Sequence, residues 1–264
     1  MTAISTQDGK YSEETKLMKG RVALVTGASR GIGAATAKLL AYHGATVGVN
    51  YYNNYEAAQS IVEEIEVSDG KAIAVQADVT DEAQVQKMVQ RISEAFGQID
   101  TLVLSANKTF TIAPFINYQW SDFEEKLVGE LQGVFYPCKA IVPSMIEDKR
   151  GCIIAISSGL SRYPSEGFIA HSTAKSGLDA FIKNLALELG PLGIRVNAIA
   201  PGLTLTEATM FLPEEYRENT AQATPLRRNA MPEDIAGAIL MLASNEAKFV
   251  TGVYLPVSGG IQML

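Results

Sequence analysis

Residues 22–33 read Val22-Ala-Leu-Val-Thr-Gly-Ala-Ser-Arg-Gly-Ile-Gly33, a short apolar run that passes directly into three spaced glycines and then into a helical pattern. Gly27 permits a tight turn out of a strand, Gly31 lets the backbone approach a pyrophosphate, and Gly33 allows close packing of helix on strand. The N–H groups at a helix start favour an anion. We interpret the stretch as a phosphate cradle. Its predicted cofactor-binding residues are Gly27, Ser29, Arg30, Gly31, Ile32 and Gly33.

Short apolar runs rich in Val and Ile alternate with longer helical patterns along the rest of the chain. The predicted strands are Val22–Thr26, Thr46–Tyr51, Ala72–Ala77, Thr101–Ala106, Cys152–Ser157, Arg195–Ala200 and Val253–Val257. The predicted helices are Ala34–Tyr42, Glu56–Val67, Asp81–Phe96, Ser121–Glu147, Ile169–Leu189 and Pro232–Ala243, with Asp81 and Pro232 as start signals. This alternation predicts a single-domain α/β fold, a Rossmann-type doubly wound parallel sheet.

Length and composition bound the function classes. The 264 residues, 47% hydrophobic, can bury the core of one domain, which we place at residues 20–264 behind a flexible tail at residues 1–19. The net charge of −7 without a basic stripe argues against nucleic acid, and no run approaches the roughly 20 apolar residues of a membrane span. Cys138 and Cys152 lack Cys-x-x-Cys spacing and only two histidines occur, so we expect a cytoplasmic protein without a metal site.

Further motifs follow the later strands in a fixed order. They are Asp78-Val79, Ser157-Ser158, Lys175, Pro201-Gly202, Val250-Thr251-Gly252 and Ser258-Gly259-Gly260. Together with the cradle they resemble the short-chain dehydrogenase/reductase family, in its 3-oxoacyl-carrier-protein-reductase-like branch, over residues 20–260. The resemblance implies a homodimer or homotetramer.

The resemblance also assigns expected roles. Asp78, beside Val79, contacts adenine, the Pro201-Gly202 turn with a nearby threonine holds the nicotinamide carboxamide, and Lys175 binds the nicotinamide ribose. The remaining predicted cofactor-binding residues are Tyr51, Ala106, Thr204 and Thr206. A Ser-Tyr-Lys trio with a supporting Asn moves the proton in this family, and the positions that match it here are Ser158, His171, Lys175 and Glu130.

The chain departs from the family pattern in three places, two single residues and one short segment. His171 lies thirteen residues after Ser158 and occupies the tyrosine place. Glu130 stands three residues before Gly133-Val-Phe, where the supporting asparagine is expected, and Leu104-Ser-Ala-Asn107 replaces Asn-Asn-Ala-Gly. A related enoyl reductase pattern, with a tyrosine seven residues before the lysine, meets Phe168 instead.

His171 has two interpretations. It is either a polar residue left in a site without hydride transfer, or a neutral imidazole that donates a hydrogen bond to a developing oxyanion, because a positive Lys175 four residues away disfavours imidazolium. Tyr163 is an alternative hydroxyl. Glu130 is open in the same way, since it either anchors the relay water or is a solvated or lysine-paired glutamate.

The second strand ends in Asn50-Tyr-Tyr-Asn53, without the acid that grips a ribose 2′-hydroxyl, while Arg30 can pair with a 2′-phosphate. We therefore favour NADP(H) over NAD(H). The expected function is an NADP(H)-dependent oxidoreductase that interconverts a carbonyl and an alcohol on a small-molecule or acyl-thioester substrate. The alternatives are a lyase, isomerase or cyclase on the same fold, or a nucleotide-binding protein without hydride transfer. Residues 203–230 are expected to form a lid, and residues 110–118 a pocket wall.

Overall fold

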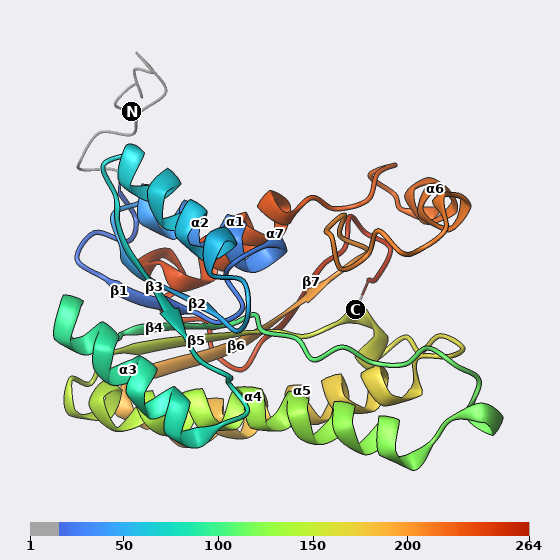
Figure 1. Cartoon of the computed structure of the whole chain (residues 1–264), viewed down its shortest axis with the longest axis horizontal. Helices are drawn as coiled ribbons and strands as arrows, with labels where there is room; N and C mark the ends of the chain where they lie inside the picture. The colour runs from blue at the N-terminus through green and yellow to red at the C-terminus, as the bar shows by residue number, and fades with distance from the viewer. Residues whose placement is uncertain (1–15, 264) are drawn as a thin grey trace.

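The computed structural model describes residues 16–263, which form one parallel sheet with helices on both faces (Figure 1). Its seven strands follow the order β3-β2-β1-β4-β5-β6-β7, and every neighbouring pair is parallel. The strands are β1 Val22–Val25, β2 Thr46–Tyr51, β3 Lys71–Gln76, β4 Thr101–Leu104, β5 Gly151–Ile156, β6 Ile194–Pro201 and β7 Tyr254–Val257. The predicted single-domain, Rossmann-type doubly wound α/β fold is confirmed.

Helices α1, α2 and α7 cover one face of the sheet, and α3, α4 and α5 cover the other (Figure 1). The helices are α1 Gly31–Tyr42, α2 Tyr55–Val67, α3 Glu82–Phe96, α4 Trp120–Glu147, α5 Ile169–Leu189, α6 Glu214–Ala223 and α7 Pro232–Ala243. Each face has its own buried hydrophobic cluster, as a sheet enclosed by two layers requires. Within residues 16–263, no helix is long and apolar enough to span a bilayer.

Both predicted helix start signals are confirmed. The carboxylate of Asp81 accepts a hydrogen bond from Gln84 N at 3.0 Å and caps α3. Pro232 is the first residue of α7, where its missing N–H costs nothing. The helix after the cradle, however, begins at Gly31 rather than at Ala34, so two of the three cradle glycines lie inside its first turn.

The N-terminal boundary of the packed chain lies earlier than residue 20. Met18 is fully buried in the core on the α1 side, and its N–H donates to His43 O at 2.9 Å. Its apolar side chain is part of that buried cluster, so Met18 belongs to the domain and not to a tail. Residues 1–15 of the expected tail lie outside the described residues.

The segment expected as a lid contains the helix α6, which the sequence patterns did not predict. No residue of α6 is buried, so it lacks the apolar stripe that marks a helix packed on a core. In Figure 1 this helix stands away from both helical layers, beyond one end of the sheet.

The strand order reverses between β1 and β4. The chain moves outward from β1 through β2 to β3, then returns to β4 on the other side of β1. In doubly wound sheets, ligands bind in the crevice at the carboxyl ends of the strands where this reversal occurs. The turn after β1 and the loop after β4 therefore frame the expected site.

We predict that Gly33→Ala destabilises the fold. A Cβ at Gly33 would collide with the carbonyl oxygen of Gly27, so α1 would have to move away from β1. The unfolding free energy should fall by about 1–3 kcal/mol, the usual cost of overpacking, measured from the denaturant midpoint.

Gly237→Ala is the matched control, because a Cβ at this exposed position of α7 meets nothing within 4 Å. It should raise the unfolding free energy by about 0.5–1 kcal/mol through helix propensity alone. Equal behaviour of the two variants would contradict the close helix–strand contact at Gly33.

Candidate functional site

The cradle joins β1 to α1 through two glycines with left-handed backbone. Gly27 has φ of 61° and Gly31 has φ of 54°, a conformation that side chains rarely adopt. A Cβ at Gly27 would also lie 2.8 Å from the Cα of Ala106 in the loop after β4. Arg30, exposed, is the N-cap residue of α1, and in the described part of the chain no side chain caps this helix. The first turn contains no acid, so its N–H groups and dipole suit an anion.

Thr26 and Asn50 tie the strand ends around the cradle together. The Thr26 hydroxyl accepts from Ser105 N at 3.0 Å and from Ala106 N at 3.1 Å, which joins β1 to β4. The Asn50 carboxamide accepts from Gly27 N at 3.1 Å and donates to Ala77 O at 3.1 Å, across β2 and β3. Asn50 is therefore used by the backbone, a role that the sequence patterns did not predict.

The predicted adenine and ribose residues differ in what they expose. Asp78 follows β3, and its Oδ1 accepts from the N–H of Thr80 at 2.8 Å and its hydroxyl at 2.7 Å, which fixes the turn that also holds Val79. Tyr51 lies at the end of β2, but its side chain is buried in the core beside Tyr55. It leaves little surface for a ribose, because β2 alternates its side chains and this one faces the helical layer.

The turn after β6 brings the remaining predicted cofactor residues to the same edge. The Thr204 hydroxyl donates to Gly202 O at 3.1 Å, and Thr204 O in turn accepts from the Thr209 hydroxyl at 2.7 Å. A Cβ at Gly31 would lie 3.3 Å from the methyl group of Thr206. The start of the lid therefore lies against the mouth of the cradle.

Ser158 lies in a hydrogen-bonded loop between β5 and α5. Its hydroxyl accepts from Leu160 N at 3.2 Å, and its carbonyl accepts from the Tyr254 hydroxyl at 3.1 Å. The buried carboxylate of Asp179 holds both sides of this loop, at 2.5 Å from the Ser157 hydroxyl and 2.6 Å from the Ser161 hydroxyl. The loop is thus fixed from α5.

Glu130 is buried between two lysines. It is 3% exposed, and its carboxylate lies 2.6 Å from Lys175 Nζ and 2.5 Å from Lys126 Nζ. Lys175 also donates to Ile156 O at 2.6 Å. Burial alone would raise the pKa of Glu130, but Lys175 and then Lys126 outweigh it and lower that pKa to about 2. Of the interpretations of Glu130 left open above, the structure shows the lysine-paired carboxylate.

Lys126 was not among the predicted site residues. It precedes Glu130 by four residues and so shares its helix face, which continues into the buried Val134, Cys138 and Ile141. That buried stripe was the available signal, because a lysine within it must be paired. Burial lowers the pKa of Lys126 to about 8, against the opposing effect of Glu130.

His171 lies in the first turn of α5, one turn before Lys175. Its ring stacks on Phe110 with the centroids 4.5 Å apart and the planes at 22°, and it is 8% exposed. Its Nδ1 is buried and has no hydrogen-bond partner within residues 16–263. Burial, reinforced by Lys175 and Lys126 and opposed by Glu130, lowers the pKa of His171 to about 3. The imidazole is therefore neutral at physiological pH, with one N–H donor and one acceptor nitrogen.

The alternative hydroxyl, Tyr163, is engaged elsewhere. Its OH donates to Met263 O at 2.8 Å near the C-terminus, and the side chain is exposed. Phe168, which stands where the enoyl reductase pattern has its tyrosine, packs its ring 5.9 Å from that of Phe110. Neither residue places a hydroxyl next to His171 and Lys175.

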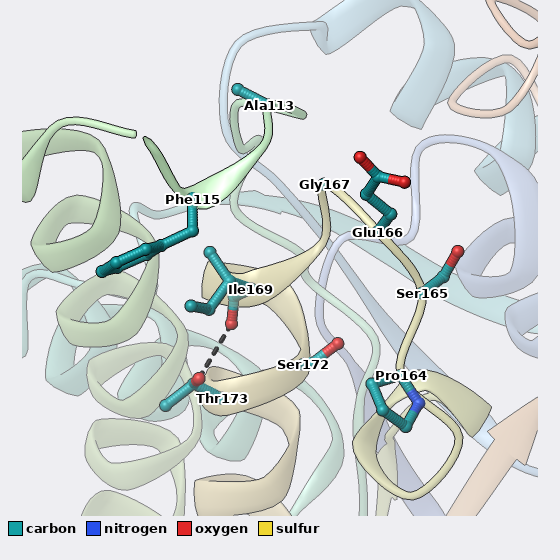
Figure 2. Close-up of a pocket in the computed structure, with 9 residues that line it drawn as sticks. All are labelled: Ala113, Phe115, Pro164, Ser165, Glu166, Gly167, Ile169, Ser172 and Thr173. Carbon is teal, nitrogen blue, oxygen red and sulfur yellow. Dashed lines mark hydrogen bonds between the residues drawn. The ribbon is translucent and has the colours of Figure 1, made fainter. Parts of the chain in front are cut away.

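A hollow of about 400 Å³ opens at the first turn of α5 (Figure 2). The loop after β4 supplies Ala113 and Phe115, the loop before α5 supplies residues 164–167, and α5 itself supplies Ile169, Ser172 and Thr173. Both flanking loops thus meet beside the turn that carries His171. Among the described residues, no group of three His, Cys, Asp or Glu side chains is placed to share a metal ion.

Comparison with known proteins fits this arrangement of cradle and helix α5. A family model described as enoyl-(acyl carrier protein) reductase matches residues 27–262. A short-chain dehydrogenase/reductase structure from Serratia marcescens superposes with a TM-score of 0.87 at 33% identity, covering 94% of this chain and 100% of that one. The chain belongs to the short-chain dehydrogenase/reductase family.

Two curated members of the family are similar over nearly their whole length. A 3-oxoacyl-(acyl-carrier-protein) reductase of Thermotoga maritima is 37% identical over 92% of this chain and 98% of its own. An L-rhamnose 1-dehydrogenase (NAD(P)(+)) of a Sphingomonas species is 38% identical over 93% of this chain and 98% of its own. These relatives are oxidoreductases that act on different classes of substrate, so the family relationship supports redox chemistry more firmly than it supports any one substrate.

We predict a pH dependence of stability that comes from His171. Unfolded histidine binds a proton near its ordinary pKa of 6.5, whereas folded His171 does so only near about 3, so the unfolded state binds more protons in this window. Stability from this group is therefore complete above 6.5 and is lost as the pH falls towards 3. Between about pH 7 and pH 5 the wild type should lose about 2 kcal/mol more unfolding free energy than His171→Asn.

The measurement is denaturant unfolding of both proteins at several pH values. His43 is retained in both, so its own titration cancels in the comparison. Parallel stability curves for the two proteins would show that His171 is not buried in its neutral form.

Proposed function

We propose that the protein is an NADP(H)-dependent oxidoreductase that interconverts a carbonyl and an alcohol on a small-molecule or acyl-thioester substrate. The observation that carries the proposal is the buried imidazole of His171 one helical turn before Lys175, whose ammonium donates to the carbonyl at the end of β5. The family relationship supports the redox class. It also supports a homodimer or homotetramer in the cytoplasm as part of the same proposal.

The residues present fit a dinucleotide. A Cβ at any of the three cradle glycines would crowd neighbouring atoms of the protein, so the tight turn needs glycine there, and the N–H groups at the start of α1 have no acid in their own first turn. Ser29 and Ile32 in the same turn, Asp78 and Val79, Ala106 and the Pro201–Thr206 segment are proposed to complete the dinucleotide site. When bound, the nicotinamide supplies the hydride. Arg30 is proposed to pair with a 2′-phosphate, which favours NADP(H).

His171 is proposed to take the tyrosine place of the family. The thirteen-residue interval from Ser158 and the four-residue interval to Lys175 support the alignment. As a neutral imidazole, its N–H donates a hydrogen bond to the substrate oxygen where negative charge develops. Transfer of that proton to the oxygen leaves an imidazolate, which the nearby positive charges of Lys175 and Lys126 stabilise and a proton from solvent then neutralises. The low pKa of His171 keeps it from being protonated before reaction, so it acts as a donor without placing a positive charge on the substrate.

Ser158, Lys175 and Glu130 are proposed to support this step. The Ser158 hydroxyl polarises the same substrate oxygen, and Lys175 positions the nicotinamide ribose. Glu130 holds the Lys175 ammonium directly at 2.6 Å, in the place where the family's asparagine supports a relay water.

We predict that the protein binds NADPH more tightly than NADH and that Arg30→Ala removes most of the preference. A charge-assisted hydrogen bond to the 2′-phosphate contributes about 1.5–3 kcal/mol, or roughly 10- to 100-fold in affinity. Titration calorimetry with both cofactors measures it.

Lys38→Ala is the control, since this basic residue lies further along α1 and pairs with Glu64 at 3.0 Å. It should leave the preference unchanged. Equal affinities for the two cofactors in the wild type would remove Arg30 from the cofactor site.

We predict that His171→Ala lowers turnover by about 10²–10⁴, the usual contribution of a positioned acid or base, while NADPH affinity changes little. Lys175→Ala should impair both, because Lys175 is proposed to bind the ribose. The assay is NADPH oxidation with a panel of small ketones and 3-oxoacyl thioesters. Asn184→Ala, on the exposed side of the same helix, should behave as wild type.

His171→Tyr extends this test, because it restores a phenol next to Ser158 and Lys175 without changing the cradle. The variant should retain or gain reduction of small activated ketones. No turnover from either protein, with NADPH binding intact, would overturn the oxidoreductase proposal for these substrates. It would favour a lyase, isomerase or cyclase, or a nucleotide-binding protein.

A further inference from the structure

Lys126 is fully buried in the second turn of α4, and all three of its ammonium hydrogens have acceptors. They are Glu130 Oε2 at 2.5 Å, Asn107 Oδ1 at 2.8 Å and Lys108 O at 2.8 Å. A lysine has three donors and no acceptor, so this ammonium is saturated. It cannot give a hydrogen bond to a substrate, and its function must lie in what it holds.

Two of the three acceptors belong to the loop after β4. This loop, residues 105–114, is fastened again where Ala113 N donates to Gly167 O at 3.2 Å, just before α5. Between these two attachments Phe110 lies with its ring centroid 5.2 Å from Lys126 Nζ and 4.5 Å from the centroid of His171. Lys126 therefore fixes the segment that lays an aromatic ring against the imidazole.

The third acceptor joins Lys126 to the charge of the site. Glu130 pairs with both Lys126 and Lys175, so the buried cluster contains two ammonium groups and a single carboxylate. The charged groups that act on His171 are Lys175 from its own helix and Lys126 and Glu130 from α4. Lys108, in the loop, has its own ammonium paired with Glu125 at 3.0 Å on the surface. Without Lys126, the negative charge of Glu130 and the positive charge of Lys175 would cancel.

Burying a third charged group is expensive, and an apolar residue on the same helix face would pack without that cost. A helix–sheet interface as apolar as that of α4 does not need an ammonium for its stability. Packing does not explain a charged residue at this position, whereas the contacts of Lys126 with the loop and with Glu130 do.

We propose that Lys126 is a positioning residue for His171, which anchors the loop carrying Phe110 against the imidazole and keeps the charge of the buried cluster positive. The inference rests on the proposed function, because it concerns how His171 is held for reaction. Imidazole is shorter than the phenol of the family, so its ring must be held at a defined orientation to reach the substrate oxygen. Stacking on Phe110 supplies that orientation.

Three variants separate the effect of the tether, the hydrogen bonds from Lys126 to the loop, from the effect of its charge. Lys126→Met keeps an unbranched side chain but leaves one ammonium with one carboxylate. Glu130→Gln leaves two ammoniums, and the double variant leaves one ammonium alone, which restores the net charge of the wild-type cluster without the tether. The readouts are the ring ¹⁵N shifts of His171 between about pH 2 and pH 8, a range that includes its pKa of about 3, with His43 as the internal reference, and the kcat and KM for NADPH oxidation.

In Lys126→Met we expect kcat to fall by up to about 100-fold, as for a misplaced catalytic group, with KM for NADPH unchanged and the His171 midpoint moved upward. The double variant should return the midpoint towards that of the wild type but keep the low kcat, because the loop is still released. Lys108→Met, which removes a surface ammonium from the same loop, should change neither readout. Wild-type shifts and kcat in Lys126→Met would overturn the proposal and leave a structural ion pair.

Phe110→Leu and Asn107→Ala keep every buried charge and serve if Lys126→Met does not fold. Both should change the His171 ring shifts and lower kcat, and unchanged values in both would equally overturn the proposal. The NMR readout does not need turnover. A wild type without NADPH oxidation would therefore defeat the proposed function, while altered His171 shifts in Lys126→Met would still establish the positioning role.

Discussion

The carboxylate of Glu130 holds two buried ammonium groups at once, and the parts of the site depend on that contact. Lys175 connects α5 to this carboxylate and, through its hydrogen bond to Ile156 O, also connects the end of β5. Lys126 connects the loop after β4 to the same carboxylate, because its ammonium also donates to Asn107 and Lys108. Two helices, a strand end and a loop therefore meet at one acid. Removing Glu130 would leave two buried ammonium groups without a carboxylate, and breaking a buried ion pair in this way costs about 3–5 kcal/mol, so the three charged residues act as one unit.

The cluster also explains how a histidine can remain neutral beside an acid. A carboxylate alone would raise the pKa of His171 and favour imidazolium. Here its effect is outweighed by burial and by two ammonium groups, and the pKa falls to about 3. Burial is the largest cause of the lowered pKa, and the net positive charge of the cluster adds to it. In the absence of Lys126, the carboxylate of Glu130 would neutralise the positive charge of Lys175 near the imidazole.

The strand ends, the cradle and the helix starts could be predicted because each has a local physical cause. Gly27 and Gly31 need their backbone conformation, and Asp81 needs only the N–H groups of the next turn. Asn50 could not be assigned in the same way, since its partners include Gly27 in the turn after β1 and Val75 and Ala77 at the end of β3, which only the assembled sheet brings together. The helix α6 was missed for the opposite reason, because it packs no residue into a core and leaves no periodic signal.

The site residues divide along the same line. Spacing placed His171, Lys175 and Ser158 on neighbouring elements, but it could not decide whether Glu130 is solvated or paired, since that depends on a lysine one turn away that faces inward.

Phenol and imidazole place different demands on a neighbouring lysine. A phenol with an ordinary pKa of about 10 becomes a better proton donor near a cation, because the cation stabilises the phenolate. A neutral imidazole donor needs the cation for another reason, which is to prevent its protonation. In the proposed reaction Lys175 can therefore be bound to Glu130 without loss, provided that a second ammonium keeps the cluster positive. His171, Glu130 and Lys126 are therefore consistent with one another, because Lys126 offsets the negative charge of Glu130 near the neutral imidazole. The two departures from the family pattern, at His171 and Glu130, can be explained together.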